Sequence, residues 1–339
     1  MDRSVVISAL EFLGKDIREN MNKQPYLSMY ERAKENNAWF LEENVLYALK
    51  QILIWLNGEE LSKFANKYHK PSYSKNLAIV CAGNIPAVAF HDIICGLLSG
   101  CVVQAKLSSC DKIIIPFLEE RMQTKFDLPI SFVDKVKNFD LIIATGSNNT
   151  SAYFDSYFKQ YPKIIRKSRS SLAVITEKDD ISGLEDDVFM YFGLGCRNVS
   201  LLFLPFDYDI DRLKQQFNKY SYLLDFYKYK NNYDYRKALF LIGGTEFEDT
   251  GFCLLQNKED LHCNISVVNY AYYKDYEYVN NFISANKENL QCVVANDFEI
   301  KTDLNKIPFG KAQTPLLEDF ADGVDTMLFI EKNIEQNIQ

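Results

Sequence analysis

A long apolar stretch at residues 77–105 limits what this chain can fold into more than any other feature. It reads LAIVCAGNIPAVAFHDIICGLLSGCVVQA, and its length would fit a membrane-spanning helix. Asn84, Pro86, His91 and Asp92 interrupt it, however, and both of its ends are rich in strand-forming residues. A buried strand, turn, helix and second strand explain both observations, so we expect that unit and no transmembrane segment.

The same order of elements recurs further along the chain. The apolar run DLIIATGS at 140–147 ends in a glycine turn, and the segment 148–161 that follows carries its aromatic residues on one helical face. Free backbone N–H groups and the positive end of the helix dipole then point toward a ligand, which suits a phosphate or a cofactor. Ser147 and Asn148 also fit a simple helix cap.

The remaining chain is helical at first and then alternates between strands and helices. Residues 1–70 place apolar side chains at helical spacing. Later strands are expected at 172–176, 201–205, 238–242, 252–256, 265–273 and 291–295, helices at 188–195, 209–230 and 276–285, and an acidic loop at 177–187. This alternation predicts an α/β protein with substantial parallel sheet, divided into two lobes.

Composition excludes several classes of function. The 339 residues are 47% hydrophobic, enough for a large core, and 46 acidic against 38 basic residues give a net charge of −8. That balance argues against a nucleic-acid partner or an anionic membrane surface. The Tyr- and Lys-rich segment 220–240 is accordingly interpreted as a solvated helix and turn, although mixed aromatic and cationic residues can bind single strands.

The cysteines indicate a reducing compartment. None of the eight forms a C-x-x-C pair, and charges interrupt the N-terminal region where a signal peptide would be apolar. The three histidines are scattered without metal-ligand spacing, so we expect a cytoplasmic protein with free thiols and no metal site.

One cysteine lies in a sequence context that suits chemistry. Cys196 follows Gly-x-Gly in YFGLGCRNVS, which leaves room for a substrate carbonyl, and Arg197 beside it can favour the thiolate. Taken alone, a buried structural cysteine is the commoner explanation of such a residue.

Five short segments, in a fixed order along the chain, favour a chemical role for Cys196. They are AGNIPA at 82–87, AKLSS at 105–109, ATGSNNT at 144–150, FGLGCRNVS at 192–200 and IPFGKAQTP at 307–315. This order resembles the aldehyde dehydrogenase superfamily. The longer strings GNIPAVAFHDIICGLLSG, IIRKSRSSLAVIT and DFADGVDTMLF resemble its acyl-CoA reductase branch, the LuxC family, which supplies fatty aldehyde in bacterial bioluminescence. The resemblance covers roughly residues 75–330.

The resemblance implies an α/β, aldehyde-dehydrogenase-like fold with a Rossmann-type cofactor lobe and an α/β catalytic lobe. The cofactor lobe would span 1–167 with its helical start, and the catalytic lobe 168–310. A C-terminal segment at 311–339 would pack back on the cofactor lobe. The acyl group and nicotinamide would meet in the cleft between the lobes. The chain is shorter than full superfamily members, so the arm that supports oligomerisation would be reduced or missing. The resemblance leaves the oligomeric state undecided.

The resemblance also assigns roles to single residues. Cys196 matches the nucleophile, and Asn84 matches the asparagine whose amide, with the Cys196 backbone N–H, stabilises the oxyanion. Lys106 matches the lysine that holds the adenosine ribose or its phosphate, and Gly146 and Ser147 match the glycine turn beside the cofactor pyrophosphate. A turn residue explains Asn84 and a strand-end charge explains Lys106 without any ligand.

Further cofactor and substrate contacts are expected at two places. Asp260 falls near the family glutamate that holds the nicotinamide ribose. Arg166, Lys167 and Arg169 form a basic group that either meets the phosphates of the cofactor or of coenzyme A, or lies in a charged surface loop.

One departure from the family pattern sets the expected direction of the reaction. Aldehyde-oxidising members carry a glutamate that activates water against the enzyme thioester, and the matching stretch RKSRSSLAV contains no acid. The resemblance therefore implies NADPH- or NADH-dependent reduction of a fatty acyl-CoA, or of an acyl carrier thioester, to the aldehyde. It allows an acyl-transferring or synthetase partner subunit. Oxidative NAD(P)-dependent aldehyde dehydrogenation and a non-catalytic acyl-binding scaffold remain the alternatives.

Overall fold

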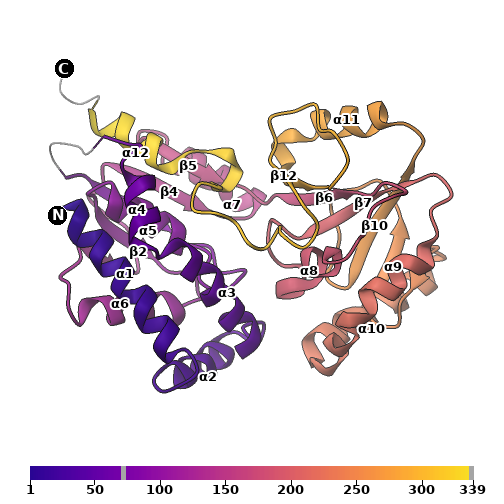
Figure 1. Ribbon diagram of the computed structural model, residues 1–339, viewed down its shortest axis with the longest axis horizontal. Coiled ribbons are helices and arrows are strands. Elements are labelled where there is room, and N and C mark those ends of the chain that lie inside the picture. Colours follow the sequence, from indigo (N-terminus) through magenta and orange to yellow (C-terminus); the bar gives the residue numbers. More distant parts are fainter. Residues whose placement is uncertain (70–73, 336–339) are drawn as a thin grey trace. The chain divides into compact units, whose positions relative to one another are not determined.

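The computed structural model describes residues 1–69 and 74–335. Residue 70 of the expected helical start and residues 336–339 of the expected C-terminal segment therefore lie outside the described residues. The chain divides into two compact units, which Figure 1 shows in the colours of the sequence. The first unit contains Met1–Ser168 and Leu316–Gln339, and the second contains Arg169–Pro315.

The first unit begins with the expected helices. They are α1 (Arg3–Asn20), α2 (Tyr26–Asn36), α3 (Glu42–Trp55) and α4 (Gly58–Ala65). The Asp2 side chain caps α1 by accepting a hydrogen bond from the Ser4 backbone N–H. The buried residues of α1 recur every three or four positions, so one face of the helix joins the core.

A parallel sheet forms the centre of the first unit. Its strand order is β3-β2-β1-β4-β5, with β1 (Asn76–Val80), β2 (Val102–Lys106), β3 (Ile130–Phe132), β4 (Leu141–Thr145) and β5 (Lys163–Arg166). Helix α5 (Phe90–Leu98) connects β1 to β2, which confirms the strand, turn, helix and strand expected at 77–105. The connecting helices α6 (Ile114–Gln123) and α7 (Asn148–Tyr157) complete a doubly wound arrangement.

The two faces of this sheet have separate cores. Ile79 and its neighbours on one face pack with α1, α5 and α6, while Ala78 and Ile142 on the other face pack with Phe158 after α7. From β1 the chain adds strands first on one side, as β2 and β3, and then on the other, as β4 and β5. The strand order therefore reverses direction between β1 and β4. In folds of this kind, ligands bind beside the carboxyl ends of the strands at such a switch.

The end of the chain returns to the first unit. The short helix η4 (Ala321–Gly323) precedes α12 (Thr326–Glu335), which packs against α5. The division of the chain falls after Ser168 and again after Pro315, so residues 311–315 belong to the second unit.

The second unit is built on a larger sheet with the order β12-β11-β6-β7-β10-β9-β8. Its strands are β6 (Ser170–Val174), β7 (Val199–Pro205), β8 (Glu248–Asp249), β9 (Leu254–Asn257), β10 (Val267–Tyr273), β11 (Leu290–Val294) and β12 (Lys306–Ile307). All neighbouring pairs are parallel except β8 with β9. This confirms the predicted α/β class with parallel sheet.

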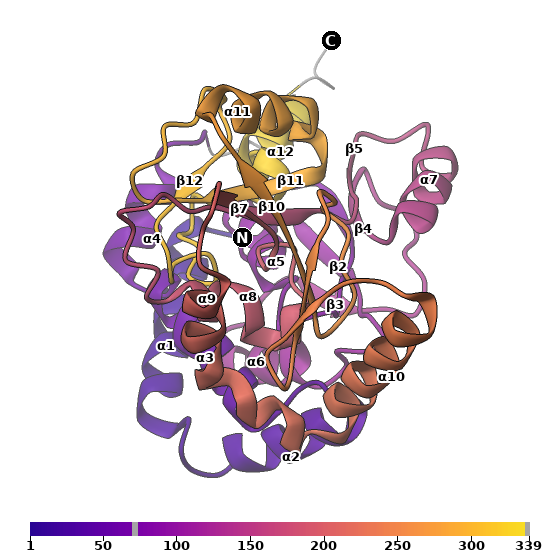
Figure 2. The same cartoon turned by 90° about the vertical axis from the view of Figure 1, so that its right-hand side faces the viewer.

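Helices cover both faces of the second sheet. In Figures 1 and 2, α11 (Tyr276–Ala285) lies on one face, and α8 (Leu184–Phe189) and α9 (Ile210–Phe217) lie on the other. Val279 and Ile283 of α11 pack onto Leu201 and Phe203 of β7. Helix η3 (Lys287–Asn289) leads into β11.

Three local predictions in the second unit are wrong. The apolar run 238–242 is the end of helix α10 (Tyr227–Gly243), because Ala and Leu suit a helix and Gly244 ends it at φ +63°. The helix expected at 209–230 is α9, then η2 (Asn218–Asp225), then the start of α10. Helix α8 begins inside the expected acidic loop, and η1 (Met190–Gly193) replaces its last turns.

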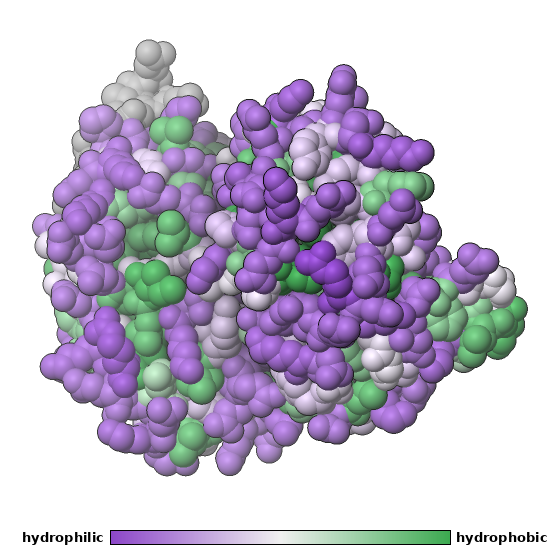
Figure 3. Space-filling model, turned by 45° about the vertical axis from the view of Figure 1, so that its right-hand side comes forward, coloured by the Kyte–Doolittle hydropathy of each residue, from purple (hydrophilic) through white to green (hydrophobic). Residues whose placement is uncertain are grey.

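The exposed end of α10 explains why an apolar run misled the prediction. Leu241 and Ile242 are 64% and 86% exposed, and of this run Phe240 packs against the core. Figure 3 shows such apolar side chains in small groups on a face that is mostly hydrophilic. Apolar sequence alone does not separate a buried strand from a helix end.

Candidate active site

Cys196 lies in a reverse turn between η1 and β7. The Asn198 backbone N–H donates to the Gly195 carbonyl oxygen at 3.1 Å, which closes a four-residue turn with Cys196 as its second residue. The Ser171 hydroxyl of β6 donates to the Cys196 carbonyl oxygen at 3.0 Å. The thiol is half-buried, so the turn presents it without enclosing it.

A buried carboxylate fixes the helix that leads to this turn. Asp187 of α8 accepts hydrogen bonds from the backbone N–H groups of Gly310 at 2.6 Å and Ala312 at 2.8 Å. Burial raises the pKa of Asp187 to about 7, although both hydrogen bonds favour the ionised form. Asp187 thereby joins α8 to the loop 307–315, one of the five segments that carry the resemblance.

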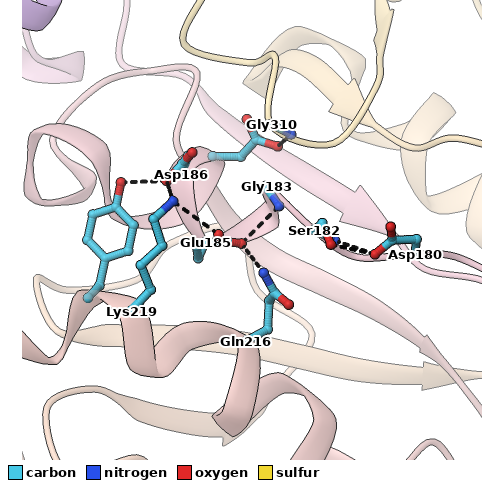
Figure 4. A network of polar contacts seen from close by, with 10 residues as sticks. Asp180, Ser182, Gly183, Glu185, Asp186, Gln216, Lys219 and Gly310 are labelled. Carbon is cyan, nitrogen blue, oxygen red and sulfur yellow. Dashed lines mark hydrogen bonds and ion pairs between the residues drawn. The ribbon is translucent and has the colours of Figure 1, made fainter.

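Charged groups hold the start of α8, as Figure 4 shows. Glu185 accepts from the Gly183 backbone N–H at 3.0 Å and from Lys219 at 3.3 Å. Lys219 also donates to Asp186 at 2.9 Å, and the Tyr220 hydroxyl donates to Asp186 at 2.8 Å. Helix α8 is therefore fixed along its length before the chain reaches Cys196.

The other cysteines are less suited to act as nucleophiles. Cys81, Cys95, Cys101, Cys253 and Cys292 are buried. Burial raises the pKa of Cys81, Cys101 and Cys263 to about 12, and that of Cys292 to about 11. Cys110 is exposed on the loop between β2 and α6. Cys196 and Cys110 are thus the thiols that an experiment must distinguish.

In the first unit, four predicted site residues follow the carboxyl ends of neighbouring parallel strands. Asn84 lies in the loop after β1, Lys106 ends β2, and Gly146 and Ser147 follow β4. Asn84, Lys106 and Ser147 are exposed at this edge. The sheet therefore gathers these residues where doubly wound folds bind nucleotides.

The glycine turn and its cap have the expected form. A Cβ atom on Gly146 would lie 2.9 Å from the Thr150 Cβ, so the turn admits no side chain there. Ser147 is the N-cap of α7, and its hydroxyl accepts from the Thr150 backbone N–H at 3.4 Å.

The loop that carries Asn84 is supported by a second buried carboxylate. Asp111 accepts hydrogen bonds from the backbone N–H groups of Ala87 at 2.8 Å and Ile114 at 3.3 Å. Burial raises the pKa of Asp111 to about 6. Ala87 has φ +53°, a conformation that an alanine adopts only when its surroundings fix it.

Two members of the basic group at 166–169 have partners inside the protein. Arg166 is 4% exposed, donates to Asp92 at 2.6 Å, and donates to the Ala321 carbonyl at 2.6 Å. Arg169 donates to the Leu290 carbonyl at 2.9 Å and pairs with Glu288 at 3.9 Å. Both guanidinium groups are thus used inside the protein, and Lys167 alone of the three is exposed. These contacts favour structural roles for Arg166 and Arg169, and contact with phosphates stays a prediction.

Asp260 lies in the loop between β9 and β10. Its carboxylate pairs with Lys258 at 2.7 Å and accepts from the His262 backbone N–H at 2.8 Å. The hydrogen bond with Lys258 is the main cause that lowers the pKa of Asp260. An ionised, half-buried carboxylate can accept from ribose hydroxyls, but its present partners are internal ones.

Several supporting residues were not predicted from the sequence. The loop that carries Cys196 is held by Asn198, Ser171 and Asp187. The loop that carries Asn84 is held by Asp111. Only Asn198 gave a usable signal, because an asparagine three residues after a glycine favours a turn. Asp187 fell in the expected acidic loop and Asp111 carried no signal, because the burial of both depends on tertiary contacts.

Two absences among the described residues complete the site. Within the described residues, no helix is long and apolar enough to cross a membrane. Among the same residues, no group of three or more His, Cys, Asp or Glu side chains is arranged to hold a metal ion.

Comparison with known proteins shows the fold. No protein-family model matches the sequence, and no curated protein matches it. Aldehyde dehydrogenase 21 from Physcomitrella patens, solved with succinate, is similar with a TM-score of 0.69 at 12% identity, over 98% of this chain and 85% of that one.

Two further structures agree with this result. A Mycobacterium tuberculosis aldehyde dehydrogenase with NAD+ has a TM-score of 0.64 at 15% identity, over 90% of this chain and 76% of that one. A mutant of aldehyde dehydrogenase C from Pseudomonas syringae, solved with NAD+ and octanal, has a TM-score of 0.63 at 10% identity. The match covers 90% of this chain and 76% of that one. The chain therefore has the aldehyde dehydrogenase fold, as its motifs predicted.

Proposed function

We propose that this protein is an NAD(P)H-dependent oxidoreductase that reduces an acyl thioester, such as a fatty acyl-CoA, to the aldehyde through a thioester on Cys196. The observation that carries this proposal is the place of Cys196, at the tip of a clamped turn in a chain with the aldehyde dehydrogenase fold. A half-buried thiol at a turn tip can approach a carbonyl carbon without displacing the core.

The chain's own groups account for the transfer of the acyl group. The Cys196 thiolate attacks the thioester carbon, a new C–S bond forms, and the carbonyl oxygen becomes an oxyanion. The Cys196 backbone N–H and the Asn84 amide are proposed to donate to that oxyanion. Its collapse breaks the bond to coenzyme A, whose thiolate leaves and takes a proton from solvent.

The first unit supplies residues that fit a dinucleotide. Gly146 keeps the turn before α7 free of side-chain atoms, and the N-terminal end of α7 offers backbone N–H groups to the pyrophosphate. Lys106 would hold the adenosine ribose or its phosphate, and Asp260 the nicotinamide ribose. When bound, the reduced cofactor would supply the hydride that the acyl group needs to become an aldehyde, and the C–S bond to Cys196 then breaks and returns the thiolate.

The missing acid favours reduction over oxidation. Residues 166–174 contain no carboxylate that could activate water against the thioester, and Ser171 in this stretch contacts the Cys196 carbonyl instead. A thioester that escapes hydrolysis persists until it is reduced. Oxidative dehydrogenation is the second candidate, because the similar solved structures named above are aldehyde dehydrogenases.

The proposal also covers the acyl donor and the cellular compartment. An acyl carrier protein could present the same thioester as coenzyme A, with or without an acyl-transferring partner subunit. Because the eight cysteines are free, we place the reaction in the reducing cytoplasm.

The test follows NADPH and NADH absorbance with acyl-CoA substrates of increasing chain length, and NADP+ and NAD+ reduction with the matching aldehydes. Cofactor oxidation that depends on acyl-CoA supports the proposal. Cofactor reduction by aldehyde without reaction of acyl-CoA would favour the oxidative candidate. Binding of acyl-CoA without binding of either cofactor would indicate a non-catalytic acyl-binding subunit.

A further inference from the structure

The side chain of Asn198 makes an unusual number of contacts for a residue two positions from a proposed nucleophile. Its amide nitrogen lies 3.1 Å from the Asp187 carbonyl oxygen, 3.2 Å from that of Val188 and 2.9 Å from that of Met190. Its amide oxygen accepts from the Gly195 backbone N–H at 2.7 Å. The residue is 4% exposed.

These contacts connect the end of α8 to the turn that holds Cys196. The three carbonyls belong to the last turn of α8 and to the residue after it, where a helix leaves its carbonyls without internal partners. Between them and Gly195 the chain reverses through Tyr191, Phe192 and Gly193, which have φ values of +55°, +60° and +74°. Non-glycine residues adopt this conformation only where contacts impose it, and Asn198 joins both ends of the segment.

Hydrogen bonds also fix the peptide whose N–H is the proposed oxyanion donor. The carbonyl of the peptide between Gly195 and Cys196 accepts from the Asn198 backbone N–H. In a trans peptide the N–H points opposite to the carbonyl, so holding the Gly195 oxygen inside the turn directs the Cys196 N–H outward. The Asn198 amide oxygen holds the preceding peptide through the Gly195 N–H.

Ser171 fixes the peptide on the other side of Cys196. Its hydroxyl donates to the Cys196 carbonyl, and its backbone N–H donates to the Asn198 carbonyl at 3.3 Å. Ser171 is fully buried in β6, so this contact comes from the rigid sheet rather than from the loop. The peptides on both sides of Cys196 are thus held by Asn198 and Ser171.

We infer that Asn198 and Ser171 are positioning residues that aim the Cys196 backbone N–H at the acyl oxygen of the substrate. This inference rests on the proposed function. It predicts that both residues matter for reactions that form an oxyanion at Cys196 and matter little for reactions that do not. A donor held in place before the reaction costs no reorganisation when charge develops.

Two chemical probes of the same thiol separate these cases. Acylation of Cys196 by p-nitrophenyl hexanoate passes through a tetrahedral oxyanion, and a burst of p-nitrophenolate reports it. Alkylation by iodoacetamide displaces iodide at a saturated carbon and forms no oxyanion, and peptide mass spectrometry reports it at Cys196. The variants are Ser171→Ala and Asn198→Ala.

Matched controls carry the same substitutions elsewhere in the second unit. Ser266→Ala removes a buried hydroxyl that bonds to the neighbouring Ile265 carbonyl. Asn280→Ala removes a buried amide that donates to the carbonyls of Tyr276 and Glu299 and accepts from the Lys301 N–H. Within the described residues, neither of these two side chains hydrogen-bonds to the turn 195–198.

We expect Ser171→Ala and Asn198→Ala to slow acylation by about 10- to 100-fold, less than loss of an oxyanion donor itself, with alkylation within about twofold of wild type. Equal loss of both reactions, or acylation at the rate of the controls, would overturn the inference. Ser171→Ala decides alone if Asn198→Ala does not fold. Cys196→Ala must abolish both reactions at this site, and its failure to do so would contradict the proposed function instead.

Discussion

Arg166 and Asp92 form a buried ion pair in which Nη2 lies 2.6 Å from Oδ1. The pair joins the end of β5 to α5, and Arg166 extends the contact to the Thr326 hydroxyl at 3.0 Å. Burial by itself lowers the pKa of Arg166, but attraction to Asp92 and Asp322 outweighs it, so the net result is a raised pKa. A guanidinium in this position fastens the C-terminal segment to the sheet.

Removing the acid of this pair should destabilise the first unit strongly. Asp92→Asn removes the carboxylate that pairs with a buried guanidinium and leaves the weaker attraction of Asp322, which should cost about 3–5 kcal/mol of unfolding free energy in urea titrations. Glu59→Gln, which breaks an exposed pair with Lys63, should leave the midpoint unchanged. A midpoint for Asp92→Asn equal to that of wild type would show that the pair is not formed.

The stability of the second unit should depend on pH through Asp187. Its pKa is raised to about 7 in the folded state but is about 4 in the unfolded chain, so the folded state holds an extra proton between these values. The contribution of Asp187 to the free energy of unfolding is greatest below pH 4 and falls as pH rises through 7. The stability of Asp187→Asn relative to wild type should therefore increase from pH 5 to pH 8. The measurement is the difference in Tm between variant and wild type at each pH. The same difference at both pH values would contradict the raised pKa.

A close approach between two loops makes Gly83 hard to replace. A Cβ atom at this position would lie 2.6 Å from the Ser108 Cβ and Oγ atoms. Gly83→Ala should cost about 1–3 kcal/mol of unfolding free energy through overpacking. Ser108→Gly removes the clashing atoms, so the double variant should recover most of that loss. Additive losses in the double variant would place the loops further apart.

Lys106 should contribute to cofactor binding and not to stability. Its side chain is exposed at the end of β2, so Lys106→Gln should leave unfolding unchanged. Loss of one cation near the ribose or phosphate should weaken NADPH binding by about tenfold, more at low salt than at high salt. Calorimetry would measure this, with Lys112→Gln, also exposed, as the matched control. An unchanged Kd would remove Lys106 from the cofactor site.

Much of the fold could be predicted because its signals are local. The run at 77–105 carries strand residues at both ends and a glycine- and proline-containing turn between, and the structure has β1, α5 and β2 there. Ser147 marked the start of α7 for the same reason, since a cap depends on residues only three positions apart.

The rest depends on contacts between distant residues. Arg166 looked like part of a surface cluster, and only the fold brings Asp92 to it. Asp187 is one of three successive acids in the sequence, yet it alone of the three reaches the backbone of Gly310 and Ala312. Neither hydropathy nor spacing distinguishes such residues from solvated charges.

The most direct test of the proposed function is to trap the acyl-enzyme. Incubation with acyl-CoA and no cofactor should add one acyl group to the protein by intact mass, and peptide mapping should place it on Cys196. Cys196→Ala should abolish the added mass, whereas Cys110→Ala, which removes the exposed thiol, should leave it unchanged. An acyl group that persists in Cys196→Ala, or that maps to another cysteine, would contradict the assignment of Cys196 as the nucleophile.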